Sequence, residues 1–372
     1  MRQTPFVALM LAACGAPCEK PGVICTMAGV HGIAGFGALT GPALETPLYD
    51  PQDVDIGPDG RVLIADDNNH AIRLLDGDTL TVVAGSSFLG DSPEGPALQA
   101  SFNHPCSATV DRDDPNRVWI AATGNHRIKA LDLTESYVSI TAGTGEPGFS
   151  GDGIDALRAE LQRPTSVAIG PDGAMYISDK LNQVIRRVAP DGTISTWAGQ
   201  PGQRGWTGDG GPAGEATLHA PEQAEYDPGN RITIADGVMY VADTGNHVVR
   251  AIDMETTIIT TIAGRATPGF DPDITDALAA RLHSPHDVAV GPDGVVYIAD
   301  AGNHCVRAWS PDGTLSTVAG RCGESGFAGD GADATDALLY GPGGVGVSAD
   351  GALWIADTYN HLVRRVVLQK TR

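Results

Sequence analysis

The chain has 372 residues, and its 46 acidic side chains outnumber 24 basic ones, which gives a formal net charge of −22 at pH 7. Proteins that bind nucleic acids do so through clustered Lys and Arg, so this balance argues against a nucleic-acid partner. A hydrophobic fraction of 42% supports a packed core. No apolar run reaches the roughly 18 residues that a membrane-spanning helix needs.

The N-terminus has the pattern of a secretory signal. Met1 and Arg2 precede a short apolar stretch that ends in small residues before Cys14, as signal peptides do. The run from Leu11 to Cys14 resembles the lipobox of bacterial lipoproteins, which implies that residues 1–13 are removed and Cys14 is lipidated. The alternative is an ordinary signal peptide with an incidental cysteine. We expect residues 14–22 to link an exported protein to a membrane of the bacterial cell envelope, at the outer membrane or cell surface, with the lipid as its only membrane contact.

The rest of the chain contains six copies of one unit. Each copy has an Asn–His pair, replaced by Asn–Gln in the third, and the Asn spacings are 56, 57, 64, 57 and 57 residues. Periods in this range are typical of propellers and solenoids. Each copy also has a Pro that opens an apolar run and an Ala-Gly pair that closes a Thr- and Val-rich run. The pairs begin at Asn69, Asn125, Asn182, Asn246, Asn303 and Asn360, and the prolines are Pro51, Pro105, Pro164, Pro221, Pro285 and Pro342.

Short β-type runs within each unit predict the blades of a propeller. The fifth copy has four such runs, 287–290, 295–299, 305–309 and 315–318, with Pro-Asp-Gly turns inside its two outer pairs. Four short strands with tight turns make one propeller blade. The fold class is therefore all-β, a six-bladed β-propeller of four-stranded blades in one domain over residues 23–368. We expect the blades at about 51–85, 105–143, 164–199, 221–264, 285–320 and 342–368 plus 23–29.

The last unit contains only three strands, and its fourth stands at the other end of the chain. Residues 23–29 end in the Thr-x-Ala-Gly pattern of an outer strand. This strand should complete the C-terminal blade and close the ring, which removes the exposed edges of an open sheet. The fourth unit is longer by seven residues, and we expect the extra residues between Tyr226 and Tyr240, in its first hairpin.

The residues of the unit resemble the NHL repeat, which Asn360-His361-Leu362 spells out. The linker from Gly148 to Gly153 (Gly-Phe-Ser-Gly-Asp-Gly) is similar to those of the long-linker NHL propellers of bacterial secreted proteins and teneurins. The resemblance implies the fold over residues 23–368. It does not imply one function, because NHL propellers include RNA binders, adhesion modules and a metal-dependent lyase relative.

Two cysteine pairs are candidates for disulfides in an exported protein. Cys18 and Cys25 flank the start of the closing strand, and Cys305 and Cys322 lie at the same end of one hairpin. Cys106 is then the odd cysteine.

The repeated polar residues have two interpretations. The His of each unit could form a metal ring, and Asp152, Asp209 and Asp330 of the Gly-Asp-Gly segments could bind calcium. We favour a structural role for both sets, because equivalent positions in different blades lie far apart and each copy alone supplies too few ligands. The histidines are His70, His126, His247, His304 and His361.

Ligand sites in propellers usually lie where blades differ, at the mouth of the central channel. The two positions after each inner Pro are polar and varied, which favours a ligand site there. The candidate ligand-binding residues are Gln52, Asp53, Cys106, Thr165, Glu222, Gln223, His286 and Asp287.

Blades four and five could also hold a transition metal. His219, Glu222, His283 and His286 supply three imidazoles and a carboxylate at adjacent blades, a set that suits zinc. The run around His286 resembles a metal-ligand strand of the peptidyl-hydroxyglycine lyase propeller, but Cys106 and Thr165 stand at other ligand places. The competing interpretation is a polar rim with solvated histidines.

Two functions follow from these patterns. The first is a monomeric, lipid-anchored binding module without a required cofactor, which takes a protein, peptide or glycan on the face of the Asn–His turns. The second is a metal-dependent lyase or hydrolase with its site at the channel mouth. No Ser/His/Asp or Cys/His set stands at an activating spacing, so we prefer the non-enzymatic function.

Overall fold

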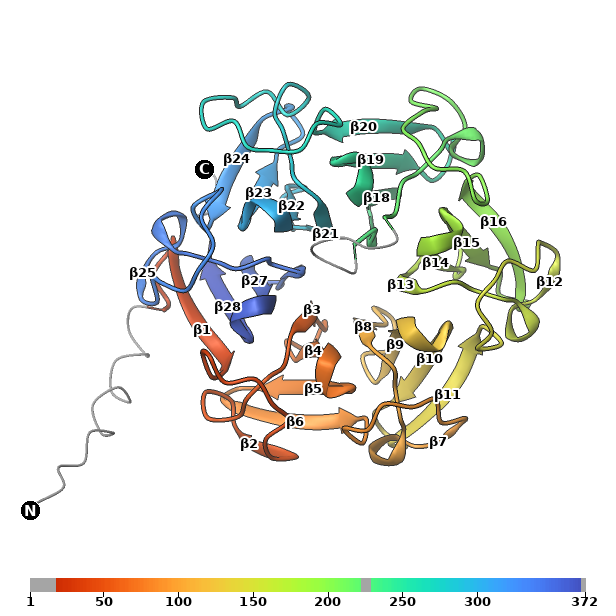
Figure 1. Cartoon of the computed structure of the whole chain (residues 1–372), viewed down its shortest axis with the longest axis horizontal. Coiled ribbons are helices and arrows are strands. Elements are labelled where there is room, and N and C mark those ends of the chain that lie inside the picture. The colour runs from red at the N-terminus through yellow and green to blue at the C-terminus, as the bar shows by residue number, and fades with distance from the viewer. Residues whose placement is uncertain (1–17, 222–228, 369–372) are drawn as a thin grey trace, which may run out of the picture.

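The structure, a computed structural model, describes residues 18–221 and 229–368. Six antiparallel sheets stand around a central axis (Figure 1). The expectation of an all-β, six-bladed propeller with four-stranded blades is confirmed. Within the described residues, helical structure is limited to single 3-10 turns of three residues each.

Each blade has four main strands, counted from the channel outward, and in five of the six blades these strands are consecutive in the chain. Blade 1 is β3 (Pro51–Ile56), β4 (Val62–Asp66), β5 (Ala71–Asp76) and β6 (Thr79–Ala84). Blade 2 is β8 (Pro105–Val110), β9 (Arg117–Ala122), β10 (Arg127–Asp132) and β11 (Tyr137–Ala142). Blade 3 is β13 (Pro164–Ile169), β14 (Met175–Asp179), β15 (Val184–Val188) and β16 (Thr193–Gly199).

The second half of the ring repeats this order. Blade 4 is β17 (Ile232–Ala235), β18 (Val238–Asp243), β19 (Val248–Asp253) and β20 (Ile259–Ala263). Blade 5 is β21 (Pro285–Val290), β22 (Val296–Asp300), β23 (Cys305–Trp309) and β24 (Leu315–Ala319). Blade 6 is β26 (Gly344–Val347), β27 (Ala352–Asp357), β28 (Leu362–Val367) and, from the N-terminus, β1 (Val23–Gly29).

The linkers between blades add short strands and turns that the sequence patterns did not predict in this form. Four blades gain a fifth, outermost strand of two or three residues. These strands are β2 (Thr40–Pro42), β7 (Gly95–Pro96), β12 (Ile154–Asp155) and β25 (Ala332–Asp333). Linker 3-10 turns follow at η2 (Ala97–Gln99), η4 (Ala156–Arg158), η6 (Ala213–Glu215) and η9 (Ala334–Asp336).

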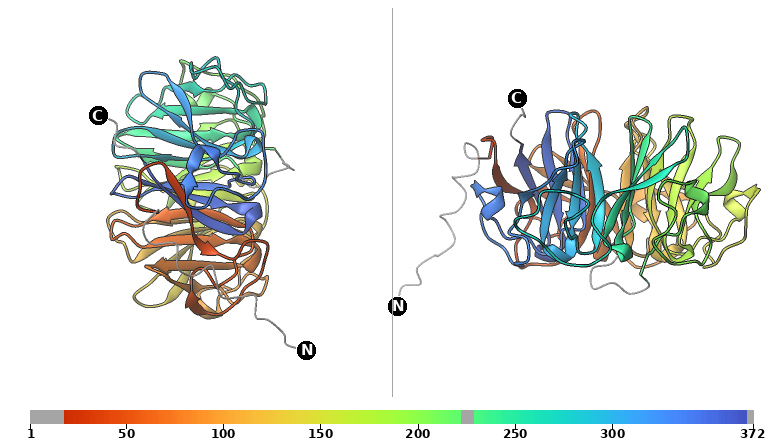
Figure 2. Two further views of the ribbon diagram at one scale, coloured as in Figure 1. Left: turned by 90° about the vertical axis from the view of Figure 1, so that its left-hand side faces the viewer. Right: turned by 90° about the horizontal axis from the view of Figure 1, so that it is seen from above.

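The strands run between two faces of the ring, which is seen edge-on in Figure 2. One face carries the 3-10 turns between the second and third strands of the blades, and we call it the Asn–His face. The opposite face carries the tight turns of the outer and inner strand pairs, and we call it the hairpin face. The turns of the Asn–His face are η1 (Asp67–Asn69), η3 (Thr123–Asn125), η5 (Lys180–Asn182), η7 (Thr244–Asn246), η8 (Ala301–Asn303) and η10 (Thr358–Asn360).

The N-terminal strand closes the ring as expected. β1 pairs antiparallel with β28, with Ile24 opposite Val366 and Gly29 opposite Leu362. A disulfide joins Cys18 to Cys25 on this strand, and a second joins Cys305 to Cys322 in blade 5. Cys106 is a buried thiol. The chain ends are thus held together at one blade.

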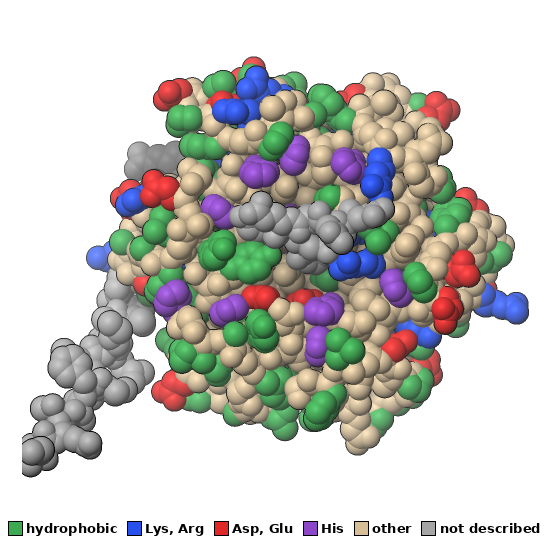
Figure 3. All heavy atoms as spheres, viewed as in Figure 1, with side chains coloured by type: hydrophobic (Ala, Val, Ile, Leu, Met, Phe, Trp, Pro, Cys, Tyr) green, Lys and Arg blue, Asp and Glu red, His purple; other side chains and the backbone are tan. Residues whose placement is uncertain are grey.

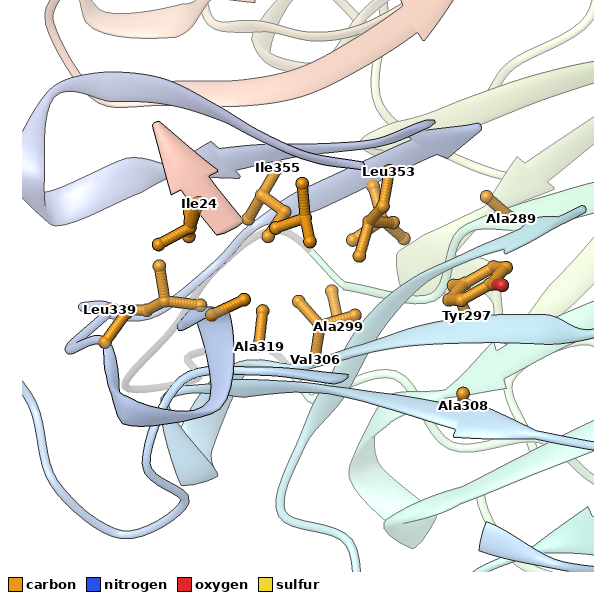
Figure 4. Close-up of a cluster of buried hydrophobic side chains, with 14 residues drawn as sticks. Ile24, Ala289, Tyr297, Ala299, Val306, Ala308, Ala319, Leu339, Leu353 and Ile355 are labelled. Carbon is orange, nitrogen blue, oxygen red and sulfur yellow. The ribbon is translucent and has the colours of Figure 1, made fainter. Parts of the chain in front are cut away.

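The hydrophobic core lies between neighbouring blades rather than in one central mass. Figure 4 shows one such cluster, in which Ile24 packs with Leu353 and Ile355 of blade 6 and with Ala299 and Val306 of blade 5. Burial of an aliphatic side chain contributes about 2 kcal/mol. Because Ile24 comes from the far end of the sequence, this interface couples ring closure to blade packing.

The extra residues of blade 4 do not lie where we expected them. The β17–β18 hairpin is tight, with only Asp236 and Gly237 between its strands, so the insertion does not lie there. It precedes β17, between Pro221 and Gly229, and includes residues 222–228 outside the described part of the chain. Pro221 therefore does not open the inner strand of this blade, and the expected start at 221 places the strand too early.

Candidate functional site

The turns of the Asn–His face are held by one repeated network. In blade 1, Asp66 Oδ1 accepts the Tyr49 N–H at 2.8 Å, and Asp66 Oδ2 accepts bonds from Asn69 and Arg73. Asn69 Nδ2 also donates to the carbonyl of Gly35 in the linker, at 2.7 Å. The same Asn-to-linker bond occurs from Asn125, Asn182, Asn246, Asn303 and Asn360. This network joins the turn to the linker of its own blade.

The Gly-Asp-Gly carboxylates belong to the same framework. Asp152, Asp209 and Asp330 form ion pairs of 3.0, 2.7 and 2.7 Å with arginines whose side chains are fully buried. Asp330 also accepts a bond from Thr26 on the closing strand. Linker phenylalanines cover several of these guanidinium groups, as Phe149 does for Arg186 at 4.6 Å. The carboxylates thus fix the linkers, and the calcium hypothesis for them gains no support from their contacts.

The histidines that follow the turns connect each blade to the next. His247 Nδ1 accepts the N–H of Ser284 at 3.0 Å, and His361 Nδ1 accepts that of Asp50 at 3.2 Å. In blade 3, Gln183 makes the equivalent connection through two hydrogen bonds to the backbone of Ala220. The remaining junctions use His70, His126 and His304. These side chains act as interblade ties, so the metal-ring interpretation does not describe their placement.

Backbone conformation and pKa agree with this role. His247 has φ +57°, a left-handed conformation that glycine adopts more easily, so the imidazole offsets a local backbone cost. Burial, helped by neighbouring His283, lowers the pKa of His247 to about 4. Burial also lowers the pKa of His70 and of His126. A low pKa keeps the imidazole neutral, and the tautomer with its proton on Nε2 can accept the bond at Nδ1.

The predicted ligand-binding residues that the structure describes are buried. Gln52, Cys106, Thr165 and His286 are at most 5% exposed, and Asp53 and Asp287 are 6% exposed. Cys106, for example, contacts the hydroxyl of Thr123. These side chains are therefore buried rather than exposed, and their role in ligand binding stays a prediction. Glu222 and Gln223 lie outside the described residues.

The insertion changes which residues of blade 4 face the channel. Asp243 accepts the His219 N–H as Asp300 accepts that of His283. Counting back along the hairpin from Asp243 shows that Asn230 and Arg231 of blade 4 are equivalent to His286 and Asp287 of blade 5. We had expected Glu222 and Gln223 at these two positions. The sequence contains a pattern that indicates this register, because Ile232 to Ala235 is an alternating run directly before an Asp-Gly turn.

Arg231 crosses the channel and joins four other blades. Its Nη1 donates to Asp53 at 3.1 Å, to Asp287 at 3.5 Å and to the carbonyl of Gly343 at 3.3 Å. Its Nη2 donates to the carbonyl of Cys106 at 2.6 Å. The side chain is 1% exposed. We call Arg231, Asp53 and Asp287 the central ion cluster, and the bonds of Arg231 connect blade 4 to blades 1, 2, 5 and 6 across the channel.

The central ion cluster contains two carboxylates and one guanidinium, and both carboxylates are buried. Burial raises the pKa of Asp287 to about 7, an effect that Arg231 opposes and Asp53 reinforces. Loss of Arg231 would leave two buried carboxylates without a counterion, so Arg231 stabilises the channel.

Below the central ion cluster the channel widens into a cavity of about 360 Å³. The inner strands of all six blades line it, namely β3, β8, β13, β17, β21 and β26. Its outer lining includes exposed Asp113 and Pro171 at the turns of the hairpin face. The cavity thus opens away from the face on which we expected a site.

The Asn–His face presents aromatic side chains around its centre. Tyr49 and Tyr340 are 39% and 40% exposed, and each packs edge-on against the His tie of the preceding blade, at 5.6 Å between ring centroids. Figure 3 shows the histidines distributed around the middle of this face. We call Tyr49, Tyr340, His104 and His283 the aromatic rim; His104 and His283 make the corresponding contacts with His70 and His247.

The proposed metal corner is only partly within the described structure. His219, His283 and His286 are described, while Glu222 is not. Within residues 18–221 and 229–368, no three His, Cys, Asp or Glu side chains stand close enough together to hold a metal ion. Cys14, the predicted lipidation site, also lies outside the described residues. No described helix is long and apolar enough to span a membrane.

Six four-stranded blades around a channel, with each outer strand linked to the next inner strand, define the class of protein as a closed β-propeller. The NHL repeat family model matches residues 48–73, 282–309 and 339–365, so the chain contains NHL repeats within its six-bladed propeller. It is 28% identical to teneurin-1 of Gallus gallus over 95% of its length, but it spans only 14% of that much longer protein.

Solved structures from Bacteroides are among those that share the fold. A Bacteroides thetaiotaomicron protein of unknown function has a TM-score of 0.69 at 18% identity, and the match covers 92% of this chain and 74% of the other. An auxiliary nutrient binding protein of Bacteroides ovatus has a TM-score of 0.65 at 16% identity, over 92% and 76% of the two chains.

Proposed function

We propose that this protein is an exported, lipid-anchored binding module that takes a glycan or peptide on its Asn–His face. The observation that carries the proposal is the aromatic rim. Its rings are partly exposed, and each is held by a His of the neighbouring blade. Phenol and imidazole rings offer flat apolar surface together with hydrogen-bonding atoms, at little cost in side-chain entropy.

Hydrogen bonds between blades cross-link the scaffold beneath the rim, which favours binding. The His ties fix the loops that bear the rim, and the central ion cluster joins the inner strands below them. A preorganised surface loses little conformational entropy when a ligand binds. The Bacteroides ovatus neighbour is described as a nutrient binding protein, which is compatible with this role but, at 16% identity, supports the fold alone.

Export and anchoring are inferred from the chain's own residues. Two disulfides suit an oxidising compartment, and Cys14 stands four residues before bridged Cys18. The test is metabolic labelling with a palmitate analogue in a bacterial host, followed by protease treatment of intact cells. Wild-type protein should carry label and fractionate with membranes, whereas Cys14→Ser should lose both. Unlabelled wild-type protein in the cytoplasm would contradict anchoring and export.

The binding proposal is tested by screening residues 18–372 on glycan and peptide arrays in parallel. We expect saturable binding to one of the two classes. Binding to neither, by protein whose folding is verified by circular dichroism, would overturn the proposal. The screen also separates the two ligand classes.

A further inference from the structure

Each blade carries a buried cation on its third main strand, and in five blades the linker supplies a partner for it. Arg73 and Lys129 bond to linker residues in blades 1 and 2. Arg186, Arg250 and Arg364 bond to the Gly-Asp-Gly carboxylates of blades 3, 4 and 6. The corresponding cation of blade 5 is the exception.

Arg307 of blade 5 is 2% exposed. Its Nε donates to the carbonyl of Ser316 at 3.3 Å, and its Nη1 has no hydrogen-bond partner among the described residues. Asp300 lies 3.9 Å from Nη1. In blades 3, 4 and 6 the equivalent inner carboxylates lie 3.7, 3.8 and 3.4 Å from Nη1 of their arginines. Arg307 therefore keeps the inner carboxylate of its counterparts, but no described linker residue supplies the outer one.

The sequence of the blade 5 linker explains this difference. Asp273 stands at the position of Asp152, but Pro272 replaces the glycine that precedes that carboxylate in the other blades. Proline is restricted to φ of about −65°, so the linker cannot make the same turn. Asp273 is exposed and, within the described structure, forms no ion pair with the buried arginine. The replaced glycine has φ +86° in Gly151, +91° in Gly208 and +90° in Gly329.

Blade 3 shows which donors the outer carboxylate serves. Asp152 Oδ1 accepts a bond from Arg186 Nη2 at 3.0 Å. It also accepts bonds from the N–H and the hydroxyl of Thr196, at 2.8 and 3.0 Å. Thr196 lies opposite Arg186 in the strand ladder, and Thr317 lies opposite Arg307 in the same register. Blade 5 thus presents the same three donor groups at the outer edge of β24 (Figure 1).

The surroundings of these donors favour an anion. Thr317 is half-buried, and its hydroxyl lies 3.5 Å from the disulfide sulfur of Cys322, which is a weak acceptor. The linker carboxylate Asp271 is paired with Arg281 at 2.7 Å, which reduces its repulsion of an incoming anion. Burial lowers the pKa of Arg307, so a second counterion would stabilise its charged form.

We propose that Arg307 and Thr317 form a site that binds a carboxylate group supplied from outside the chain. One oxygen of the ligand would take the position that Asp152 Oδ1 occupies in blade 3, and would accept bonds from the guanidinium, the Thr317 N–H and the Thr317 hydroxyl. The carboxylate could come from a free monocarboxylate or from an aspartyl side chain of a peptide. This inference does not rest on the function proposed for the Asn–His face.

Three probes test the requirement for a carboxylate and distinguish its sources. Acetate, acetyl-Gly-Asp-Gly-amide and acetyl-Gly-Asn-Gly-amide are titrated into the full-length protein by calorimetry, at constant ionic strength so that screening is equal. The Asp peptide should bind at least about tenfold more tightly than the Asn peptide, because hydrogen bonds to a charged group are stronger.

The relative affinities of the two carboxylates identify the source. Acetate that binds as tightly as the Asp peptide would support a free carboxylate as the ligand, and a tighter Asp peptide would support a peptide ligand. Equal affinities of the Asp and Asn peptides, or no saturable binding of either carboxylate, would overturn the proposal.

Two matched variants and one restored linker locate the site. Thr317→Val removes one donor at nearly constant shape and should weaken carboxylate binding about fivefold or more. Thr196→Val, in blade 3 where Asp152 already serves the donors, should leave binding unchanged. Pro272→Gly combined with Ile274→Gly restores the Gly-Asp-Gly segment, so Asp273 should reach Arg307 and abolish binding.

Equal effects of the two Val variants would contradict the assignment of the site. Undiminished binding by a folded protein with the restored linker would also contradict it. If the protein with the restored linker does not fold, the comparison of Thr317→Val with Thr196→Val decides.

Discussion

At the scale of single residues, the His ties show how one side chain serves both turn geometry and assembly. His247 sits in the left-handed region and accepts a backbone bond from the next blade. Replacing it with Ala should destabilise the fold by about 1–2 kcal/mol, because the Ser284 N–H loses its acceptor. His247→Gln should recover much of this loss, since Gln183 already performs the role in blade 3. Urea unfolding of the three proteins at pH 8 measures both effects, and a Gln variant as unstable as the Ala variant would contradict the tie.

The lowered pKa of His247 gives a pH-dependent difference between the wild type and His247→Gln. Folding favours the neutral imidazole, so the wild type has its full stability above the unfolded pKa near 6.5 and loses stability as pH falls towards about 4. Gln does not titrate. The Gln variant should therefore gain relative stability between pH 6.5 and 4, by up to about 2 kcal/mol after allowance for solvent screening. Unfolding curves of both proteins at several pH values test this, and a constant difference would contradict it.

Arg231 is the residue on which the channel depends most. Arg231→Met keeps the volume but leaves Asp53 and Asp287 buried without a counterion, so it should destabilise the fold by about 3 kcal/mol or more. Adding Asp53→Asn and Asp287→Asn should recover part of the loss. Guanidinium unfolding of the single and triple variants provides the comparison. A single variant within about 0.5 kcal/mol of the wild type would show that the cluster does not stabilise the ring.

At the scale of elements, strand β1 determines whether the ring is closed. Deletion of residues 1–29 removes the partner of β28 and the buried side chain of Ile24. An exposed strand edge promotes pairing with other chains. The truncated protein should therefore elute as oligomers or aggregates in size-exclusion chromatography, whereas deletion of residues 1–17 should leave a monomer. A monomeric, cooperatively unfolding protein that lacks β1 would show that closure is dispensable.

The register of blade 4 is the element that the sequence analysis predicted wrongly. Strand order and ring closure were predictable because each unit repeats its Pro, Asn–His and Ala-Gly markers. Blade 4 was assigned the wrong register because Pro221 resembles the other inner prolines, although Gly229 takes the equivalent place. Positions counted from Pro221 therefore do not reach the inner strand of blade 4, so Arg231 was missed, while the predicted Glu222 and Gln223 lie outside the described residues.

At the scale of the whole molecule, the candidate site was harder to predict than the fold. Alternation along an inner strand does not show which polar residues reach the surface, because the channel is lined by six strands at once. Gln52 and Thr165 were therefore predicted at the channel mouth, yet both side chains are buried. The aromatic rim comes from residues just before the inner strands, such as Tyr49 and Tyr340, whose exposure depends on packing between blades.

The central claim, that the Asn–His face binds the ligand, is tested most directly by comparing three tyrosines of equal exposure. Tyr49 and Tyr340 belong to the aromatic rim, while Tyr137, 42% exposed, begins β11 at the hairpin face. Affinity for the strongest array ligand is measured by calorimetry for Tyr49→Ala, Tyr340→Ala and Tyr137→Ala. We expect the two rim variants to weaken binding about tenfold or more and Tyr137→Ala to match the wild type. Unchanged affinity in both rim variants, or a loss confined to Tyr137→Ala, would contradict the account.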